Sequence, residues 1–123
     1  MHKLSIINAF ARRLLTGNIE VAFGNHSGKN LTYVRFVYCD TGYWGLNPNV
    51  MHPDGKLTGN ISIFAGKYDL ELIQIECYPN ISGEVKSLKN LKKLTYYRSS
   101  YTEVTGSKTD LYNEGVNITG FAV

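Results

Sequence analysis

Cysteine, proline and long apolar runs are all scarce in this chain. Its 123 residues include two cysteines and three prolines, and the net charge is only +3. Two cysteines cannot build the disulfide framework of a small secreted domain, and no Cys-x-x-Cys pair marks a zinc or redox site. No stretch approaches the roughly 18 consecutive apolar residues of a membrane-spanning helix. We therefore expect one folded domain without a membrane span.

Catalytic and metal-binding motifs are missing as well. The three histidines, His2, His26 and His52, lack the H-x-x-x-H or H-E-x-x-H spacing of a metal site. The sequence has neither G-x-S-x-G nor a phosphate-binding glycine-rich loop, and no local motif pairs two of its ten acidic residues. These absences predict a protein that is not an enzyme and uses no metal or cofactor.

The beginning of the sequence lacks the features of an export signal. The segment Met1–Asn8 has no long apolar core and no small-residue cleavage site. The expected location is therefore a virion or the cytoplasm. In such a protein Cys39 and Cys77 are expected to be free, buried and apolar in character. Their positions near the ends of consecutive predicted strands leave a disulfide between them as the alternative.

The most informative feature of the sequence is an internal repeat. Four segments share the pattern apolar, hydroxyl, Gly, polar, apolar, and only the last residue of the fourth departs from it. Their glycines are 42, 24 and 23 residues apart, which indicates a repeat architecture. Each glycine is expected at a sharp turn, where a side chain would resist a positive φ. The segments are Leu15–Ile19, Leu57–Ile61, Ile81–Val85 and Val104–Lys108.

A strand pattern accompanies these segments. Residues 31–36, 70–75 and 91–96 each fit L-x-x-L-x-L, and Leu4-x-Ile6 and Val116-x-Ile118 are shorter candidates for a first and a last copy. Alternation has the period of a strand with one buried face, and a single such unit cannot enclose a core. We therefore predict that parallel strands stack on one another. Their predicted centres are residues 33–37, 72–76 and 93–97.

Together these patterns resemble the leucine-rich repeat. The string L-x-x-L-x-L-x-x-N/C is matched from Leu31 to Cys39. The L-T-G-x-I element is similar to plant-type repeats and to irregular repeats of gut Bacteroidota and their phages. The resemblance spans residues 15–119 and implies a mostly β or α/β fold, a short solenoid of four to five coils with one parallel strand per coil. The expected parts are an N-terminal cap at 1–14, repeats at 15–41, 57–80, 81–103 and 104–123, and an inserted loop at 42–56.

The resemblance also implies that the solvent-facing, concave side of the strands binds a ligand. If the apolar positions of each strand point inward, alternation turns the residues between them outward. The outward set includes tyrosine and arginine, which are enriched in binding hot spots. A decorated but unused face is the other interpretation. The predicted binding residues are Tyr33, Arg35, Val37, Leu72, Gln74, Glu76, Lys93, Thr95 and Tyr97.

The inserted loop is a second candidate contact. It combines Gly, Asn-Pro and Pro-Asp-Gly turn signals with the only tryptophan of the sequence. Loops on a rigid scaffold commonly carry function, so we predict contacts through Tyr43 and Trp44. The alternative is that Trp44 covers an open end of the solenoid.

A basic run covers residues 86–98, with five positive charges and no acidic residue. Basic residues interleaved with aromatic ones are typical of nucleic-acid-binding segments. However, Leu88, Leu91 and Leu94 keep the period of the repeat. The lysines between them are therefore expected to form a solvated face, and an acidic protein partner is the main alternative.

The two ends of the repeat lead to the functional prediction. Met1–Leu14 is expected to cap one end, with a short helix around Ala9–Leu14, whereas the apolar C-terminus has no cap. Terminal coils need caps for solubility, so Phe121 and Val123 are predicted to lie against another chain. We predict a non-enzymatic structural or protein-interaction protein, and the resemblance suggests a phage virion component (tail, fibre or decoration protein). The alternative is a bacterial repeat module that binds a protein, and nucleic-acid binding through residues 86–98 ranks below both.

Overall fold

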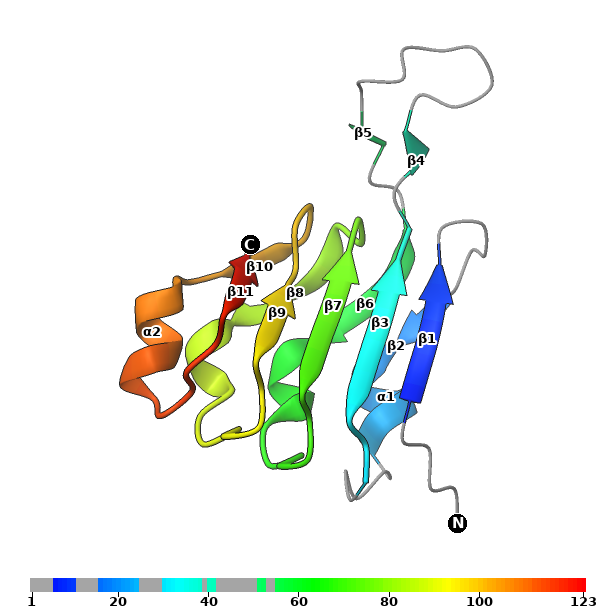
Figure 1. Cartoon of the computed structure of the whole chain (residues 1–123). Coiled ribbons are helices and arrows are strands. Elements are labelled where there is room, and N and C mark those ends of the chain that lie inside the picture. Colours follow the sequence, from blue (N-terminus) through cyan, green and yellow to red (C-terminus); the bar gives the residue numbers. More distant parts are fainter. Residues whose placement is uncertain (1–5, 11–15, 25–29, 39, 42–50, 53–54) are drawn as a thin grey trace.

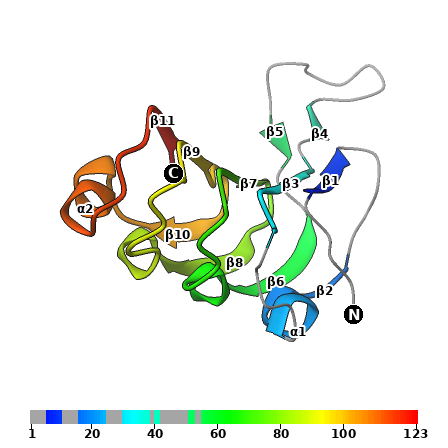
Figure 2. The ribbon, with the colours of Figure 1, turned by 60° about the horizontal axis from the view of Figure 1, so that its bottom comes forward.

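The computed structural model describes residues 6–10, 16–24, 30–38, 40–41, 51–52 and 55–123. Most of its strands form two sheets, which face each other (Figures 1 and 2). Sheet A has the strand order β1-β3-β7-β9-β11, sheet B the order β10-β8-β6-β2, and β4 pairs with β5 alone. The strands are β1 (Ile6–Phe10), β2 (Thr16–Asn18), β3 (Tyr33–Val37), β4 (Asp40–Thr41), β5 (Met51–His52), β6 (Lys56–Asn60), β7 (Leu72–Glu76), β8 (Asn80–Glu84), β9 (Tyr96–Arg98), β10 (Glu103–Thr105) and β11 (Gly120–Ala122). The helices are α1 (Ile19–Gly24), η1 (Ile61–Phe64), η2 (Val85–Ser87) and α2 (Lys108–Asn113).

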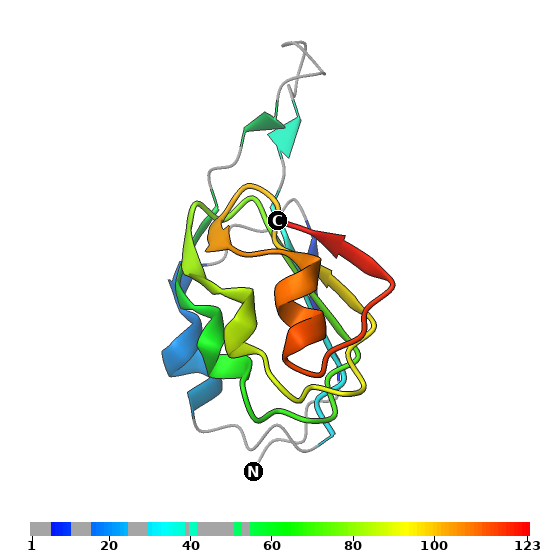
Figure 3. The ribbon, with the colours of Figure 1, turned by 90° about the vertical axis from the view of Figure 1, so that its left-hand side faces the viewer.

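Four times the chain passes from sheet B through a short helix into sheet A. The passes are β2-α1-β3, β6-η1-β7, β8-η2-β9 and β10-α2-β11. Every neighbouring pair of strands within sheets A and B is parallel. Figure 3 looks along the stack, so that successive passes lie behind one another. The predicted mostly β chain with stacked parallel strands is confirmed, with two strands in each pass where one was predicted.

The L-T-G-x-I segments form the turn from sheet B into each helix. The residue after the glycine caps the helix in three of the four passes. The side-chain oxygen Asn18 Oδ1 accepts a hydrogen bond from the backbone N–H of Glu20 (2.7 Å), and Asn60 Oδ1 accepts one from Ser62 (2.8 Å). Ser107 caps α2 in a capping box. As predicted, all four glycines have positive φ, between +114° and +124°: Gly17, Gly59, Gly83 and Gly106.

The strand predicted at residues 93–97, β9 of sheet A, lies in a different frame from the predicted one. β3 and β7 pair over five residues as predicted, but β9 pairs Tyr97 with Ile73. By the same register Leu94 is the equivalent of Leu70 and lies just before the strand. The predicted strand at 93–97 is therefore displaced by three residues, because the leucines of this segment recur every three residues and fit more than one frame.

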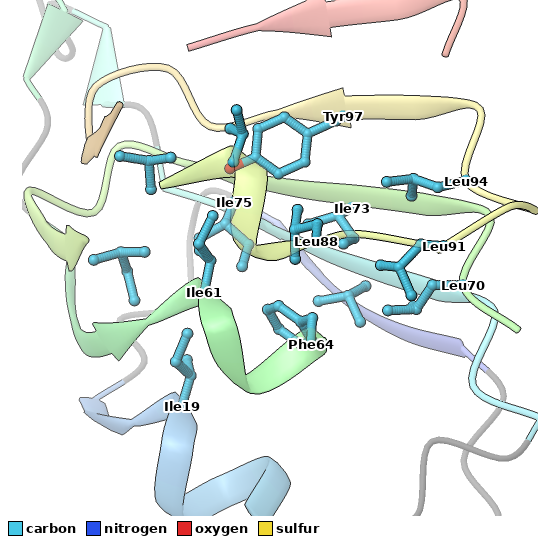
Figure 4. Close-up of a cluster of buried hydrophobic side chains, with 14 of the residues drawn as sticks. Ile19, Ile61, Phe64, Leu70, Ile73, Ile75, Leu88, Leu91, Leu94 and Tyr97 are labelled. Carbon is cyan, nitrogen blue, oxygen red and sulfur yellow. The ribbon is translucent and has the colours of Figure 1, made fainter. Parts of the chain in front are cut away.

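The hydrophobic core fills the space between the two sheets (Figure 4). Inward-facing strand residues meet the first apolar residue of the helices, and Phe23 of α1 contacts Phe64 of η1 edge to face at 5.1 Å between ring centroids. Burial of one such side chain stabilises the fold by about 1.5–3 kcal/mol. The largest fully buried side chains are Tyr78, Tyr97, Phe64, Leu31, Ile61, Leu70, Ile73, Ile75, Ile81, Leu88, Leu91 and Leu94.

The N-terminal end of sheet A is a strand where a helix was predicted. Residues 6–10 form β1, which pairs with β3 along its whole length. The helix prediction is therefore wrong for Ala9 and Phe10, and residues 11–14 lie outside the described part of the chain. Isoleucine and phenylalanine favour strands, and β1 pairs with backbone groups of β3 that would otherwise be a free sheet edge.

The C-terminal end is better covered than the sequence suggested. Leu111, Val116 and Ile118 are each at most 2% exposed, and α2 stands in front of the space between the sheets (Figure 3). No cap was predicted for this end, and α2 supplies an apolar side that covers it. Phe121 is half-buried against the core and Val123 remains 47% exposed.

The predicted insertion contains a short antiparallel pair, β4 with β5, which projects beyond the end of sheet A (Figures 1 and 3). It begins at Asp40, slightly before the predicted boundary, and Lys56 already belongs to β6. Tyr43 and Trp44 lie outside the described residues, so their predicted contacts stay predictions.

Candidate protein-binding face on sheet A

The outer face of sheet A is defined here by the residues of β3, β7 and β9 that point away from the core, together with Ser100, two positions beyond the end of β9. Side chains of a strand point alternately to its two faces, and the residues between the outward ones are buried against sheet B. Strand pairing aligns these outward residues in three rows that run across the strands. The rows are Tyr33-Leu72-Tyr96, Arg35-Gln74-Arg98 and, if the same register is extended by two residues beyond β9, Val37-Glu76-Ser100.

A continuous hydrogen-bonded ladder crosses this face. Arg35 donates from Nε to Gln74 Oε1 at 3.0 Å, and Gln74 in turn donates from Nε2 to Glu76. On the next strand Arg98 donates from Nε to Glu76 Oε1 at 3.2 Å, and its Nη2 lies 3.1 Å from the same oxygen. Three strands are therefore joined by side chains as well as by their backbones, and the polar groups are held in place before any ligand arrives.

The ion pair at the end of this ladder has one buried and one accessible partner. The side chain of Glu76 is 9% exposed and that of Arg98 is 41% exposed. The Glu76 carboxylate raises the pKa of Arg98, with a smaller contribution from Tyr96 beside the guanidinium. A buried carboxylate is costly unless it is paired and hydrogen-bonded, and here both of its oxygens accept hydrogen bonds.

Six of the nine predicted binding residues lie on this face: Tyr33, Arg35, Val37, Leu72, Gln74 and Glu76. The three residues predicted for the strand at 93–97 do not lie on it, because β9 is displaced by three residues from the predicted frame. The outward positions there are Tyr96, Arg98 and Ser100, which were not predicted from the sequence. The distance from the repeat glycine would have found them, since Gly59 to Leu70 and Gly83 to Leu94 are both eleven residues.

The prediction that Tyr97 faces outward is wrong. Its ring is fully buried and stacks on Phe121, with 5.8 Å between centroids, and Figure 4 shows it among the core side chains. Burial raises the pKa of the Tyr97 phenol. Ser99 lies close enough to lower this pKa slightly, but among the described residues neither hydroxyl has a partner that meets hydrogen-bond geometry, so these two groups are unusual polar members of the core.

Lys93 and Thr95 are exposed, as predicted, but they precede the strand and belong to the rim of the sheet. Lys93 Nζ lies 2.9 Å from Asp69 Oδ1, and this contact raises the pKa of the lysine. Thr95 donates through its backbone N–H to the carbonyl oxygen of Glu71. These residues stabilise the turn between neighbouring passes, and they do not contribute to the three rows.

The basic run behaves as its leucine spacing predicts. Leu88, Leu91 and Leu94 are fully buried, whereas Lys86, Lys89, Lys92 and Lys93 are exposed. Lys86 and Lys93 have acidic neighbours, Glu84 and Asp69. The run is a solvated return segment whose charge is partly compensated, which does not favour a continuous nucleic-acid groove.

The expectation of free cysteines is wrong for Cys77. It is fully buried, as expected, but it is disulfide-bonded, and no free cysteine occurs among the described residues. The other cysteine of the sequence, Cys39, lies outside them. A cross-link removes conformational freedom from the unfolded chain, and disulfides persist mainly in oxidising surroundings.

In the part of the chain that the structure describes, no cluster of three or more His, Cys, Asp or Glu residues could hold a metal ion. The same part contains no helix of the length and apolarity needed to cross a membrane. No family model, no curated protein and no solved structure matches this chain.

Proposed function

We propose that the chain is a short leucine-rich-repeat-like solenoid that binds another protein through the outer face of sheet A and catalyses no reaction. The observation that carries this proposal is the hydrogen-bonded ladder from Arg35 to Arg98 beside the accessible row Tyr33-Leu72-Tyr96. Rigid polar groups next to aromatic and aliphatic side chains are typical of binding hot spots. A ligand then meets groups that lose little further conformational entropy on binding.

A pair of matched variants tests this proposal. Leu72→Arg places a bulky charge in the centre of the face, whereas Val21→Arg places the same charge at a 78% exposed site on α1. We expect native pull-downs with Leu72→Arg to lose the partner proteins that the unchanged chain and Val21→Arg retain, as read by quantitative mass spectrometry. Equal retention by all three proteins would contradict the proposal.

Within this class we propose a virion component, such as a tail, fibre or decoration protein. Two features support it: the likeness of the L-T-G-x-I repeats to those of Bacteroidota phages, and the disulfide at Cys77, which suits a particle surface better than a reducing cytoplasm. The C-terminal Phe121 and Val123 are its proposed assembly contacts. Sedimentation velocity with and without residues 121–123 tests them, and a monomer at high concentration that is indifferent to the deletion would refute assembly through this end.

A bacterial repeat module that binds a protein ligand as a monomer is the second candidate. One observation favours it over end-on assembly: Leu111, Val116 and Ile118 are already buried by the last pass itself. Little apolar surface is then left for a second chain at this end, with Val123 as the main exposed apolar residue of the C-terminal strand segment. The same sedimentation experiment separates the two candidates.

A further inference from the structure

The outer face of sheet A presents positive charge to solvent although it contains a carboxylate. Both oxygens of Glu76 are occupied, one by Arg98 and the other by Gln74. The Glu76 side chain is also four to five times less exposed than that of Arg98. Among the nine residues of the three rows, the accessible charge is therefore that of the Arg98 guanidinium, and the half-buried Arg35 lies in the same row.

An apolar row lies directly beside these guanidiniums. Tyr33, Leu72 and Tyr96 are aligned across three strands, two residues before the arginine row. Alternate residues on one face of a strand are about 7 Å apart. Two neighbouring side chains of a bound segment can therefore contact both rows at once. Tyr96 also covers Gly120 of β11, where a Cβ in place of the glycine hydrogen would lie 2.6 Å from its ring, so this aromatic surface is held in a defined place.

We propose that the segment bound by this face is a protein segment in which an acidic side chain stands beside an aliphatic or aromatic one. This inference rests on the proposed function and names the chemistry of its partner. The carboxylate would accept hydrogen bonds from the exposed Arg98 guanidinium, and the neighbouring apolar side chain would contact Leu72 and the tyrosines. Charge complementarity of this kind sets specificity and the rate of association.

Phosphate-rich ligands fit the face less well. Nucleic-acid binding depends on several cationic groups that follow a phosphate backbone, and the exposed lysines Lys86, Lys89 and Lys92 belong to the return segment of the third pass, outside the three rows. The face itself combines two guanidiniums with a covered carboxylate and an apolar row. A short acidic and apolar peptide segment is the ligand that uses all of these groups.

Selection from a displayed library of random dodecapeptides, with the folded full chain as bait, tests the inference. We expect enrichment of peptides with Asp or Glu next to an aliphatic or aromatic residue. An enriched peptide, made synthetically, should bind at least about tenfold more weakly to Arg98→Gln, because a hydrogen bond to a charged group is lost. Its affinity should also fall as salt is raised.

Two further variants keep the result interpretable. Arg98→Gln leaves Glu76 buried without its counter-charge, so the double variant Glu76→Gln with Arg98→Gln removes both charges and should show the same loss of binding. Lys93→Gln removes one charge from the rim and should bind as the unchanged protein does. Circular dichroism checks that each variant is folded.

Three outcomes would overturn the inference: no acidic enrichment, an equal loss of binding in Lys93→Gln, or binding of a 20-nucleotide oligothymidylate with the same dependence on Arg98. If native partners are lost with Leu72→Arg but bind through segments without acidic residues, the proposed function stands and only this inference fails. If Leu72→Arg loses no partner, the proposed function itself fails.

Discussion

Replacement of the repeat glycines by alanine should destabilise the fold in two ways: by backbone strain at a positive φ, and by close contact of the new Cβ with the preceding pass. The contact is present at Gly83 but is not found at Gly17 in the described part of the chain. Gly17 and Gly83 occupy equivalent positions and have nearly the same φ, +114° and +123°. A Cβ at Gly17 would meet no atom of the described residues within 4 Å, whereas a Cβ at Gly83 would lie 2.5 Å from Asn60 Oδ1 and 2.9 Å from Ile61 Cγ1. The two substitutions therefore share the backbone strain and differ in the close approach.

The magnitudes follow from these contacts. Gly17→Ala should lower the free energy of unfolding by about 1–3 kcal/mol, the usual cost of a residue held in a disfavoured backbone region. Gly83→Ala adds the displacement of Asn60, whose side chain caps η1 through Ser62. Loss of such a cap costs about 0.5–2 kcal/mol. Gly83→Ala should therefore be the more destabilising substitution by at least this amount.

Urea unfolding followed by far-ultraviolet circular dichroism, without reductant, measures both changes. A double-mutant cycle isolates the contact itself: Asn60→Ala removes the atom that the new Cβ would meet, so Asn60→Ala with Gly83→Ala should cost less than the sum of the single variants. Equal losses at Gly17 and Gly83 would refute the close approach between passes. Strict additivity in the cycle would refute the role of Asn60 in it.

Three other perturbations address the core and its titrating groups. Leu94→Ala should cost about 2–5 kcal/mol because Leu94 is fully buried, while the exposed Lys92→Ala should stay within about 0.5 kcal/mol; similar losses in denaturant melts would contradict the frame of the third pass. Tyr97→Phe removes a buried hydroxyl that has no hydrogen-bond partner among the described residues and should leave the unfolding free energy unchanged or raise it by about 1 kcal/mol; a clear loss in the same melts would show that the hydroxyl is satisfied. Burial, with a smaller effect of Tyr38, raises the pKa of Tyr78 to about 12, so the folded state favours the neutral phenol. The stability contributed by the neutral phenol is complete below about pH 10, the usual tyrosine value, and should fall as the pH rises toward 12. In unfolding experiments at stepped pH, Tyr78→Phe should reduce this dependence of the unfolding free energy on pH. An unchanged dependence would contradict the raised pKa of Tyr78.

The parts of the fold that were predictable from sequence are those where a residue pattern is compatible with one local structure. A glycine followed by Asn or Ser before a helix is such a pattern, and all four repeat glycines have the predicted positive φ. The frames of β3 and β7 were equally clear, because Val34 and Phe36 flank a polar residue and Ile73 and Ile75 do the same, which is the alternation of a strand with one buried face.

The parts that were missed depend on contacts between distant residues. In the third pass the core accepts Tyr97 and, two residues later, Ser99, where the second pass has Ile73 and Ile75, and hydropathy alone does not favour this choice. The predicted set of binding residues used the same wrong frame. Arg98 was therefore missed, although it binds Glu76 at the end of the hydrogen-bonded ladder. The helix predicted around Ala9 fails for a similar reason, because residues 6–10 pair with β3, which lies more than twenty residues further along the chain.

The anchoring of the β4–β5 hairpin has a consequence for the evolution and engineering of this chain. The flanks of the hairpin are fastened to adjacent carbonyl oxygens of the following pass: Tyr38 donates its N–H to Glu76 and Gly55 donates its N–H to Cys77. The pairing of β3 with β7 is in register over all five residues of both strands, up to the point where the chain leaves for the hairpin. Since the entropic cost of a loop rises only slowly with its length, this site should accept segments of very different size, even a whole domain, while the stack beneath keeps its geometry.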